Sequence, residues 1–315
     1  MKNRKAIGVI GTGMIGASMA ALFTGNGYRT VVYAVSEELG QRGLASYEAC
    51  FAELISQGLV TQDEFLRCRE LLEITCSYEA LKDVEFVFEC VLEQTAIKHE
   101  VYQNLEKYCP NIKAIASSTS AISADELAEG LARKELLAVA HPWNPPHLAP
   151  CVEVVRSQYT SDEALKLILE LLEDTGKETV VLKKGIPGFI GNRLQYAMYR
   201  EAVYLVEQGV ASPEEIDRTL KYSFAPRYTS IGIFEHFDNC GLDLAKSIED
   251  YLFPCLSSDT RASALVDEKC REGNFGVKSG RGMLDWSVHD PEDMKRRAAA
   301  PFFKYFNWKL PGRDL

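Results

Sequence analysis

The sequence predicts an α/β fold in which a first domain with a mostly parallel sheet is followed by a second domain made only of helices. Short apolar runs alternate with helical segments through the first 188 residues, a glycine-rich turn joins the first run to the first helix, and strand-like runs almost vanish after that point. Strands that alternate with helices form parallel sheets. We therefore expect a first domain over residues 1–188 and a helical second domain over residues 189–315.

The expected strands are short runs rich in β-branched, aromatic and small apolar residues. They cover residues 5–10, 29–35, 84–90, 114–117, 136–140, 151–155 and 178–182. Helical segments separate them, and the longest, residues 37–73, is interrupted by a break near Gly58. That break predicts a helical hairpin.

Composition excludes several classes of protein. The 315 residues exceed the length at which one hydrophobic core stops growing, and the formal net charge is −10, so we expect two domains and no nucleic-acid partner. The nine cysteines form no CxxC pair, which favours a reduced, cytoplasmic protein. Residues 1–5, M-K-N-R-K, and the apolar stretch that follows to Phe23 superficially resemble a secretory signal. We expect none, because that stretch carries an ordered glycine pattern that a signal would not need. We expect no membrane helix and, because the histidines lack metal-ligand spacing, no metal.

Residues 11–16 read G-T-G-M-I-G between a predicted strand and a predicted helix. In such a motif Gly11 allows the tight turn, Gly13 lets a pyrophosphate approach the backbone, and Gly16 lets helix and strand pack closely. The helix N-terminus, with Met14 and Ile15, then faces the phosphates. This context predicts a Rossmann-type dinucleotide site; the alternative is that the glycines only shape a turn.

The end of the second predicted strand departs from the usual NAD pattern. An acidic residue normally binds the ribose there, but we assign that position to Ala34. Without a carboxylate the 2′-phosphate of NADP is not repelled, and Ser36 and Arg42 are its candidate contacts. Glu37 or Glu38 could still bind the ribose. We favour NAD and keep NADP as possible.

A histidine motif follows the predicted strand 136–140. His141 opens the segment H-P-W-N-P-P, and Glu153 follows twelve positions later. Open α/β sheets bind ligands at the carboxyl ends of their strands. The alternative is a buried structural histidine held by the proline-rich loop. Two other polar segments, residues 117–120 and 187–193, favour the functional interpretation.

With these motifs in this order, the chain resembles the 3-hydroxyacyl-CoA dehydrogenase superfamily from residue 7 to about 286. The resemblance implies that His141 is the catalytic base and Glu153 its carboxylate partner. It also implies that Ser120 and Asn192 bind the reacting oxygen. By the same resemblance we expect a homodimer, in which two chains associate through their helical domains. The cofactor site it implies further includes Glu93, Lys98, Ser118 and Asn144.

Details of these motifs favour one branch of the superfamily. H-P-W-N-P-P and the segment N-R-L-Q-Y-A at 192–197 resemble the L-gulonate 3-dehydrogenases, which include lambda-crystallin, and the carnitine dehydrogenases. Arg227 could pair with a substrate carboxylate; the alternative is a surface or interdomain salt bridge. Residues 273–286, however, resemble the C-terminal signature of short-chain hydroxyacyl-CoA enzymes.

We therefore expect an enzyme that transfers a hydride between a small 3-hydroxy or 3-keto carboxylic acid and NAD(P). A 3-hydroxybutyryl-CoA dehydrogenase is one alternative, and a crystallin-like structural NAD-binding protein is another. We expect Met198 and Tyr199 to pack in the core or in a dimer. His147 either lines the substrate pocket or is a solvated loop residue.

Overall fold

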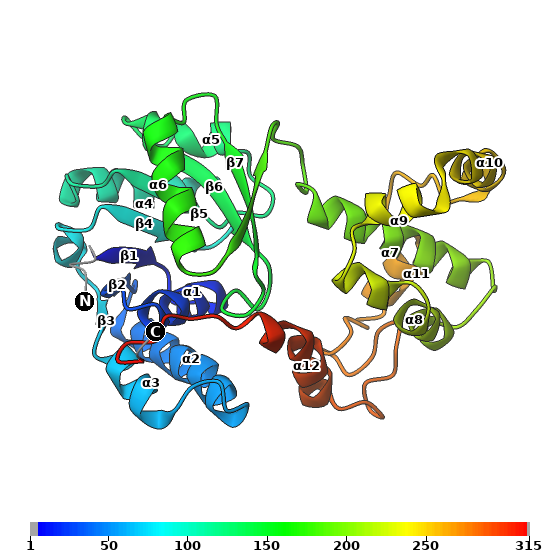
Figure 1. Cartoon of the computed structure of the whole chain (residues 1–315), viewed down its shortest axis with the longest axis horizontal. Coiled ribbons are helices and arrows are strands. Elements are labelled where there is room, and N and C mark those ends of the chain that lie inside the picture. Colours follow the sequence, from blue (N-terminus) through cyan, green and yellow to red (C-terminus); the bar gives the residue numbers. More distant parts are fainter. Residues whose placement is uncertain (1–5, 314–315) are drawn as a thin grey trace. The chain divides into compact units, whose positions relative to one another are not determined.

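The computed structural model describes residues 6–313, which fall into two units (Figure 1). The first comprises Met1–Ile190 with Ala299–Leu315, and the second comprises Gly191–Ala298. The expected second domain of residues 189–315 was therefore too long at its C-terminal end. Trp308 and Leu310 explain the difference, because both are buried in the core of the first unit.

An eight-stranded sheet forms the centre of the first unit, in the order β3-β2-β1-β4-β5-β6-β7-β8. Only β6 and β7 pair antiparallel; the other neighbours are parallel. The expectation of a mostly parallel sheet is confirmed. The strands are β1 (Ile7–Ile10), β2 (Thr30–Tyr33), β3 (Leu72–Thr75), β4 (Phe86–Glu89), β5 (Ala114–Ser117), β6 (Leu137–Pro142), β7 (Cys151–Arg156) and β8 (Glu178–Leu182).

Helices cover both faces of this sheet. One apolar cluster joins the sheet to α1, α2 and α6 and the other joins it to α4 and α5, because successive residues of each strand point to opposite faces. The helices are α1 (Met14–Gly25), α2 (Glu37–Ser56), α3 (Gln62–Arg69), α4 (Thr95–Tyr108), α5 (Ala124–Ala128) and α6 (Asp162–Asp174), with short 3₁₀ turns η1 (Tyr78–Leu81) and η2 (Lys134–Leu136).

The expected helical stretch 37–73 is interrupted as predicted, but its last residues are not helical. Thr61 begins α3 with a capping box, in which its side chain accepts from the Glu64 backbone and the Glu64 carboxylate accepts from the Thr61 backbone. The chain then enters β3, which pairs with β2. Sequence analysis missed this strand because its four residues, L-E-I-T, directly follow a helix without a glycine or proline break.

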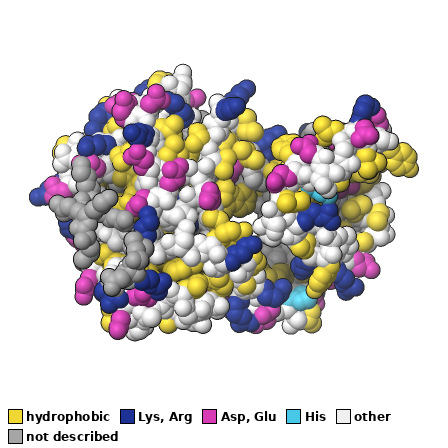
Figure 2. Space-filling model, in the orientation of Figure 1, with side chains coloured by type: hydrophobic (Ala, Val, Ile, Leu, Met, Phe, Trp, Pro, Cys, Tyr) yellow, Lys and Arg dark blue, Asp and Glu magenta, His cyan; other side chains and the backbone are white. Residues whose placement is uncertain are grey.

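The second unit is helical, as expected. It contains α7 (Gly191–Glu207), α8 (Pro213–Tyr222), η3 (Ala225–Thr229), α9 (Ile233–Cys240), α10 (Leu242–Leu252), η4 (Phe253–Cys255), α11 (Ala264–Arg271) and most of α12 (Pro291–Ala299), after which comes η5 (Ala300–Tyr305). Within residues 191–298 the buried side chains are Val203, Ala245 and Ser257. Many large apolar side chains are exposed, as Figure 2 shows on its visible face.

Candidate active site

The glycine turn after β1 has the geometry of a pyrophosphate cradle. Gly11 has a φ of +111°, and a Cβ there would lie 2.6 Å from the Cys90 carbonyl oxygen. A Cβ at Gly16 would lie 2.0 Å from the Gly11 carbonyl oxygen, so helix and turn pack too closely for a side chain. At Gly13, by contrast, a Cβ would meet no atom of the described chain within 4 Å. The backbone of Gly13 is therefore open to a ligand.

The start of α1 suits an anion. Gly13 caps this helix with no side-chain hydrogen bond, which leaves the N–H groups of the first turn, at Met14 and Ile15, without a capping side chain. Helix N-termini of this kind bind phosphates. Met14 is 62% exposed and so lies at the mouth of the cradle. The residues present fit a dinucleotide.

At the end of β2 the side chains of Ala34 and Val35 differ in exposure. Ala34 is buried, and its Cβ lies 3.5 Å from the position that a Cβ on Gly40 would take. Its side chain therefore faces Gly40 of α2. The next side chain, Val35, is 75% exposed, so an apolar residue occupies the outward position. Ser36 caps α2, accepting a hydrogen bond from the Leu39 backbone.

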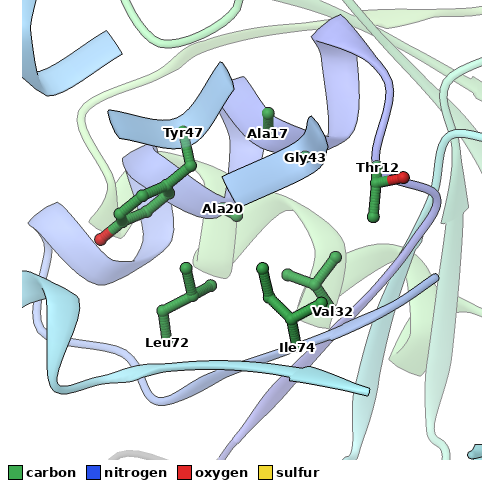
Figure 3. Close-up of a pocket in the computed structure, with 8 residues that line it drawn as sticks. All are labelled: Thr12, Ala17, Ala20, Val32, Gly43, Tyr47, Leu72 and Ile74. Carbon is green, nitrogen blue, oxygen red and sulfur yellow. The ribbon is translucent and has the colours of Figure 1, made fainter. Parts of the chain in front are cut away.

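Behind the glycine turn lies a small apolar pocket between α1, α2 and the strands β2 and β3 (Figure 3). Gly43 of α2 is in close contact with the turn, since a Cβ there would lie 2.6 Å from the Thr12 Cβ. Helix α2 therefore supports the cradle directly. The pocket is lined by Thr12, Ala17, Ala20, Val32, Gly43, Tyr47, Leu72 and Ile74.

Three of the predicted site residues meet beyond the ends of β4 and β5. The Glu93 carboxylate accepts hydrogen bonds from the Ser120 backbone N–H at 2.9 Å and from the Thr119 hydroxyl. Lys98 Nζ lies 3.4 Å from Glu93 Oε2. Partial burial alone would raise the pKa of Glu93, but the Thr119 hydrogen bond, Lys98 and the backbone donors outweigh it and lower that pKa. Ser118, next to them, donates its backbone N–H to the Glu89 carbonyl.

His141 and Glu153 form the second cluster. His141 lies within β6, not beyond it as expected, and the antiparallel register places it opposite Glu153 of β7. Nδ1 of His141 lies 3.2 Å from Oε2 of Glu153, and the other carboxylate oxygen accepts the Ile190 N–H at 2.8 Å. Both side chains are buried. Nδ1 of His141 therefore faces the carboxylate, and Nε2 points away from it.

The loop after His141 is fixed by buried polar contacts. Asn144 is exposed and joined to Pro145 by a cis peptide bond. His147 is buried, which contradicts the solvated reading, and its Nδ1 lies 2.6 Å from Ser18 Oγ on α1. Its side chain therefore joins this loop to α1. Lys177 Nζ donates to the backbone carbonyls of Pro146 and Ala149.

Asn192 and Arg227 belong to the second unit. Asn192 is the second residue of α7 and is half-buried. Arg227 lies in η3 and is exposed, with Nη1 3.4 Å from a ring nitrogen of His236. Within residues 6–313 the contacts of its guanidinium are with the two ring nitrogens of His236, at 3.4 and 3.5 Å, and not with a carboxylate.

Sequence analysis missed Glu89 and Lys177, whereas Thr119 lies in the polar segment 117–120 that it singled out. Glu89 and Lys177 had a weak signal, because each is a charged residue in or beside an apolar strand. Within residues 6–313 no group of three or more His, Cys, Asp or Glu side chains could hold a metal ion. In the same range no helix is long and apolar enough to span a membrane.

Family models cover most of the chain. Residues 6–185 match the NAD-binding domain of 3-hydroxyacyl-CoA dehydrogenase, and residues 188–286 match the C-terminal domain of the same family. The two matches meet close to the division between the two units.

Three known proteins illustrate the range of relatives. A crystal structure of 5-formyl-3-hydroxy-2-methylpyridine 4-carboxylic acid 5-dehydrogenase, described as an NAD⁺-dependent dismutase, is 30% identical, covers 96% of both chains and has a TM-score of 0.84. The L-carnitine dehydrogenase of Oceanobacillus iheyensis is 32% identical over 75% of this chain and 76% of its own. A probable 3-hydroxybutyryl-CoA dehydrogenase of Bacillus subtilis is 31% identical over 90% of this chain and 97% of its own.

Proposed function

Because this chain belongs to the 3-hydroxyacyl-CoA dehydrogenase family, we propose that it oxidises a small 3-hydroxy carboxylic acid with NAD⁺, using His141 as the base. Its class is that of NAD-dependent oxidoreductases acting on a CH–OH group. The observation that carries the proposal is the buried His141–Glu153 pair, at 3.2 Å. The same residues run the reverse reduction of a 3-keto acid.

His141 takes the hydroxyl proton. Oxidation of a secondary alcohol needs that proton removed from oxygen as a hydride leaves the same carbon, and a neutral imidazole suits this near pH 7. When bound, NAD⁺ supplies the acceptor for the hydride. Glu153 accepts the Nδ1–H of His141, which leaves the Nε2 lone pair for the substrate proton and stabilises the imidazolium that forms.

Ser120 and Asn192 are proposed to hold the reacting oxygen. A hydroxyl and an amide can donate hydrogen bonds to an oxygen that gains negative charge, and such donors lower the barrier most when they are fixed in advance. Glu93 supports this role for Ser120, because it binds the backbone of the same residue. Lys98, Ser118 and Asn144 are proposed, with Glu93, to line the nicotinamide end of the cofactor site.

We propose a free acid as the substrate, with Arg227 as the partner of its carboxylate. The exposed guanidinium in η3 can bind a carboxylate through two parallel hydrogen bonds. The pyridine carboxylic acid relative and the L-carnitine relative act on carboxylic acids by their names. The 3-hydroxybutyryl-CoA relative and residues 273–286 favour the alternative, a CoA thioester.

NAD is proposed as the preferred cofactor, with NADP as the weaker one. No carboxylate stands at Ala34 or Val35, but the first turn of α2 carries the acidic residues Glu37 and Glu38. These charges disfavour an added 2′-phosphate. Arg42, the candidate phosphate contact, is already paired with Glu38 at 2.6 Å.

A homodimer through the second unit is the proposed assembly. Many large apolar side chains of residues 191–298 are exposed and few are buried. Contiguous exposed apolar surface marks interaction sites. Met198 and Tyr199, at 44% and 46% exposure, are proposed to lie in that interface. Sedimentation at micromolar concentration should give twice the chain mass; a monomer would contradict the proposal.

A cytoplasmic location is also proposed, because none of the nine cysteines is in a disulfide and reduced thiols are typical of the cytoplasm.

The deciding experiment measures initial rates at the NADH absorbance, with NAD⁺ and NADP⁺ separately. The substrates are L-gulonate, L-carnitine, 3-hydroxybutyrate and 3-hydroxybutyryl-CoA. Preference for a free acid supports the role of Arg227, and Arg227→Met should then raise its KM. Preference for the CoA ester would replace the substrate assignment. Binding of NAD⁺ without turnover of any of them would favour the structural-protein alternative.

A further inference from the structure

Glu89 is a buried carboxylate that the proposed reaction does not use. It is the last residue of β4 and has no exposed surface. Four donors surround it. Oε1 accepts from Lys98 Nζ at 2.7 Å and from the Val91 N–H at 2.8 Å, and Oε2 accepts from the Ser117 hydroxyl at 2.6 Å and the Tyr102 hydroxyl at 2.8 Å.

Full burial of the Glu89 carboxylate costs free energy unless its hydrogen bonds and its ion pair are all formed. An ionised carboxylate in a protein interior is tolerated only when it is paired and its oxygens are hydrogen-bonded. Apolar side chains of similar volume would fill the same space at no such cost. A group that satisfies four separate donors instead fixes the position of all four.

The network continues from Glu89 to the proposed substrate site. Lys98, which is fully buried, contacts Glu89 on one side and lies 3.4 Å from Glu93 on the other. Glu93 in turn accepts the backbone N–H groups of Ser120 and Ala121, at 2.9 and 3.1 Å. A chain of charged contacts thus runs from the end of β4 to the backbone of Ser120.

Glu89 is connected to Ser120 in a second way, through Ser117. Glu89 and Ser117 are register partners on β4 and β5, and the Ser117 hydroxyl donates to the Glu89 carboxylate. Ser117 is also the last residue of the strand that leads to Ser120. Glu89 therefore holds the segment that carries Ser120 at both its start and its end.

We propose that Glu89 is a positioning residue, which acts through Lys98 and Glu93 and through Ser117 to hold Ser120 where it can bind the reacting oxygen. The proposal rests on the role given to Ser120 above. It concerns the placement of residues 117–121. Lys98 and Glu93 also line the proposed nicotinamide end of the cofactor site, so the affinity for NAD⁺, which the glycine turn dominates through the phosphates, is measured beside kcat.

The principal test compares Glu89→Gln with a matched control, Glu64→Gln. Glu64 is equally a nearly buried, ion-paired carboxylate, held by Arg313 and Thr61, but it caps α3. Glu89→Gln should lower kcat about 10- to 100-fold, as expected for a support residue, while the Kd for NAD⁺ changes less than about threefold. Glu64→Gln should lower the melting temperature and leave kcat unchanged.

Hydrogen exchange supplies a readout that does not depend on turnover. In Glu89→Gln the amides of Ser120 and Ala121 should exchange faster than in the wild type, while the amides of β1 keep their protection. Exchange at those two amides that stays at the wild-type rate would overturn the positioning role, whatever the activity. Failure of the wild type to turn over any substrate would instead remove the proposed function and leave the exchange result standing.

Two milder variants cover the case in which Glu89→Gln does not fold. Tyr102→Phe and Ser117→Ala each remove one donor to Oε2 and keep the charge pair with Lys98. Each should lower kcat by several-fold with an unchanged Kd for NAD⁺. A wild-type kcat in both variants would show that the network serves stability only. A loss of kcat that only parallels a loss of NAD⁺ affinity would show that it serves cofactor binding, and either result would overturn the proposal.

Discussion

Glu153 lies directly across from His141 on the neighbouring antiparallel strand, with 3.2 Å between Oε2 and Nδ1. The ladder of backbone hydrogen bonds between β6 and β7 fixes both Cα positions, and the Ile190 N–H holds the second carboxylate oxygen. His141 and Glu153, twelve residues apart in the sequence, therefore lie side by side in the sheet. The geometry depends on the sheet and not on a flexible loop.

Replacing the base should separate chemistry from cofactor binding. His141→Ala removes the group that takes the hydroxyl proton, so turnover should fall about 10²- to 10⁴-fold. The Kd for NAD⁺, measured by fluorescence titration, should persist because the glycine turn is untouched. Unchanged turnover would contradict the assignment of His141.

The carboxylate partner should act through the tautomer of the imidazole. In Glu153→Gln an amide N–H can face Nδ1, which favours the tautomer with the proton on Nε2, the nitrogen that must accept the substrate proton. We expect kcat to fall about 100-fold or more. Glu178→Gln, on the exposed end of β8, is the control and should retain full activity.

Two glycines of the same turn should respond differently to alanine. Gly13 has a φ of −68°, which any residue adopts, and open space beside it, so Gly13→Ala should keep the wild-type melting temperature. It should weaken NAD⁺ binding by about tenfold or more, or about 1.4 kcal/mol, because its methyl group occupies the path of the pyrophosphate. Gly16→Ala, which would collide with the Gly11 carbonyl, should also lower the melting temperature. A Gly13→Ala variant with normal affinity would exclude this turn as the phosphate site.

His147 should make stability depend on pH. Burial alone lowers the pKa of His147, but the nearby Cys50 and the Glu53 carboxylate, 3.4 Å from Nε2, outweigh it and raise that pKa to about 9. Because the folded value exceeds the ordinary 6.5, the stabilisation is fully present below about pH 6.5 and is lost as the pH rises through 9. Its full size is on the order of 3 kcal/mol.

Urea denaturation at pH 6 and pH 9.5 measures this effect. The difference in free energy of unfolding between the wild type and His147→Asn should be larger at pH 6. An equal difference at pH 6 and pH 9.5 would show that folding does not raise the pKa of His147.

The C-terminal segment should contribute to the stability of the first unit. Trp308 packs against Gly25 of α1, where an added Cβ would lie 2.1 Å from its ring, and its ring meets Phe51 edge-on. Trp308→Ala should therefore cost about 3–5 kcal/mol of unfolding free energy. Lys304→Ala, at an exposed position in the same segment, should cost little. Similar melting temperatures for both variants would contradict this.

Much of the site was predictable because local sequence determines local geometry. The glycine turn follows from steric rules that act within six residues, and a serine before a helix, such as Ser36, is a common cap. The burial of Ala34 could not be derived in this way, since it depends on how closely Gly40 of another element approaches. The same holds for His147, whose partner Ser18 lies 129 residues away.

The return of the last residues to the first unit has a consequence for synthesis on the ribosome. Residues 191–298 are in effect inserted into the first unit, whose core contains Trp308 and Leu310. The core of the first unit is therefore incomplete until residues 191–298 and the segment that contains Trp308 and Leu310 have been synthesised. Until residues 308–310 leave the ribosomal tunnel, the surface of α1 and α2 that Trp308 covers is exposed, and at this stage the nascent chain is open to aggregation or to chaperone binding.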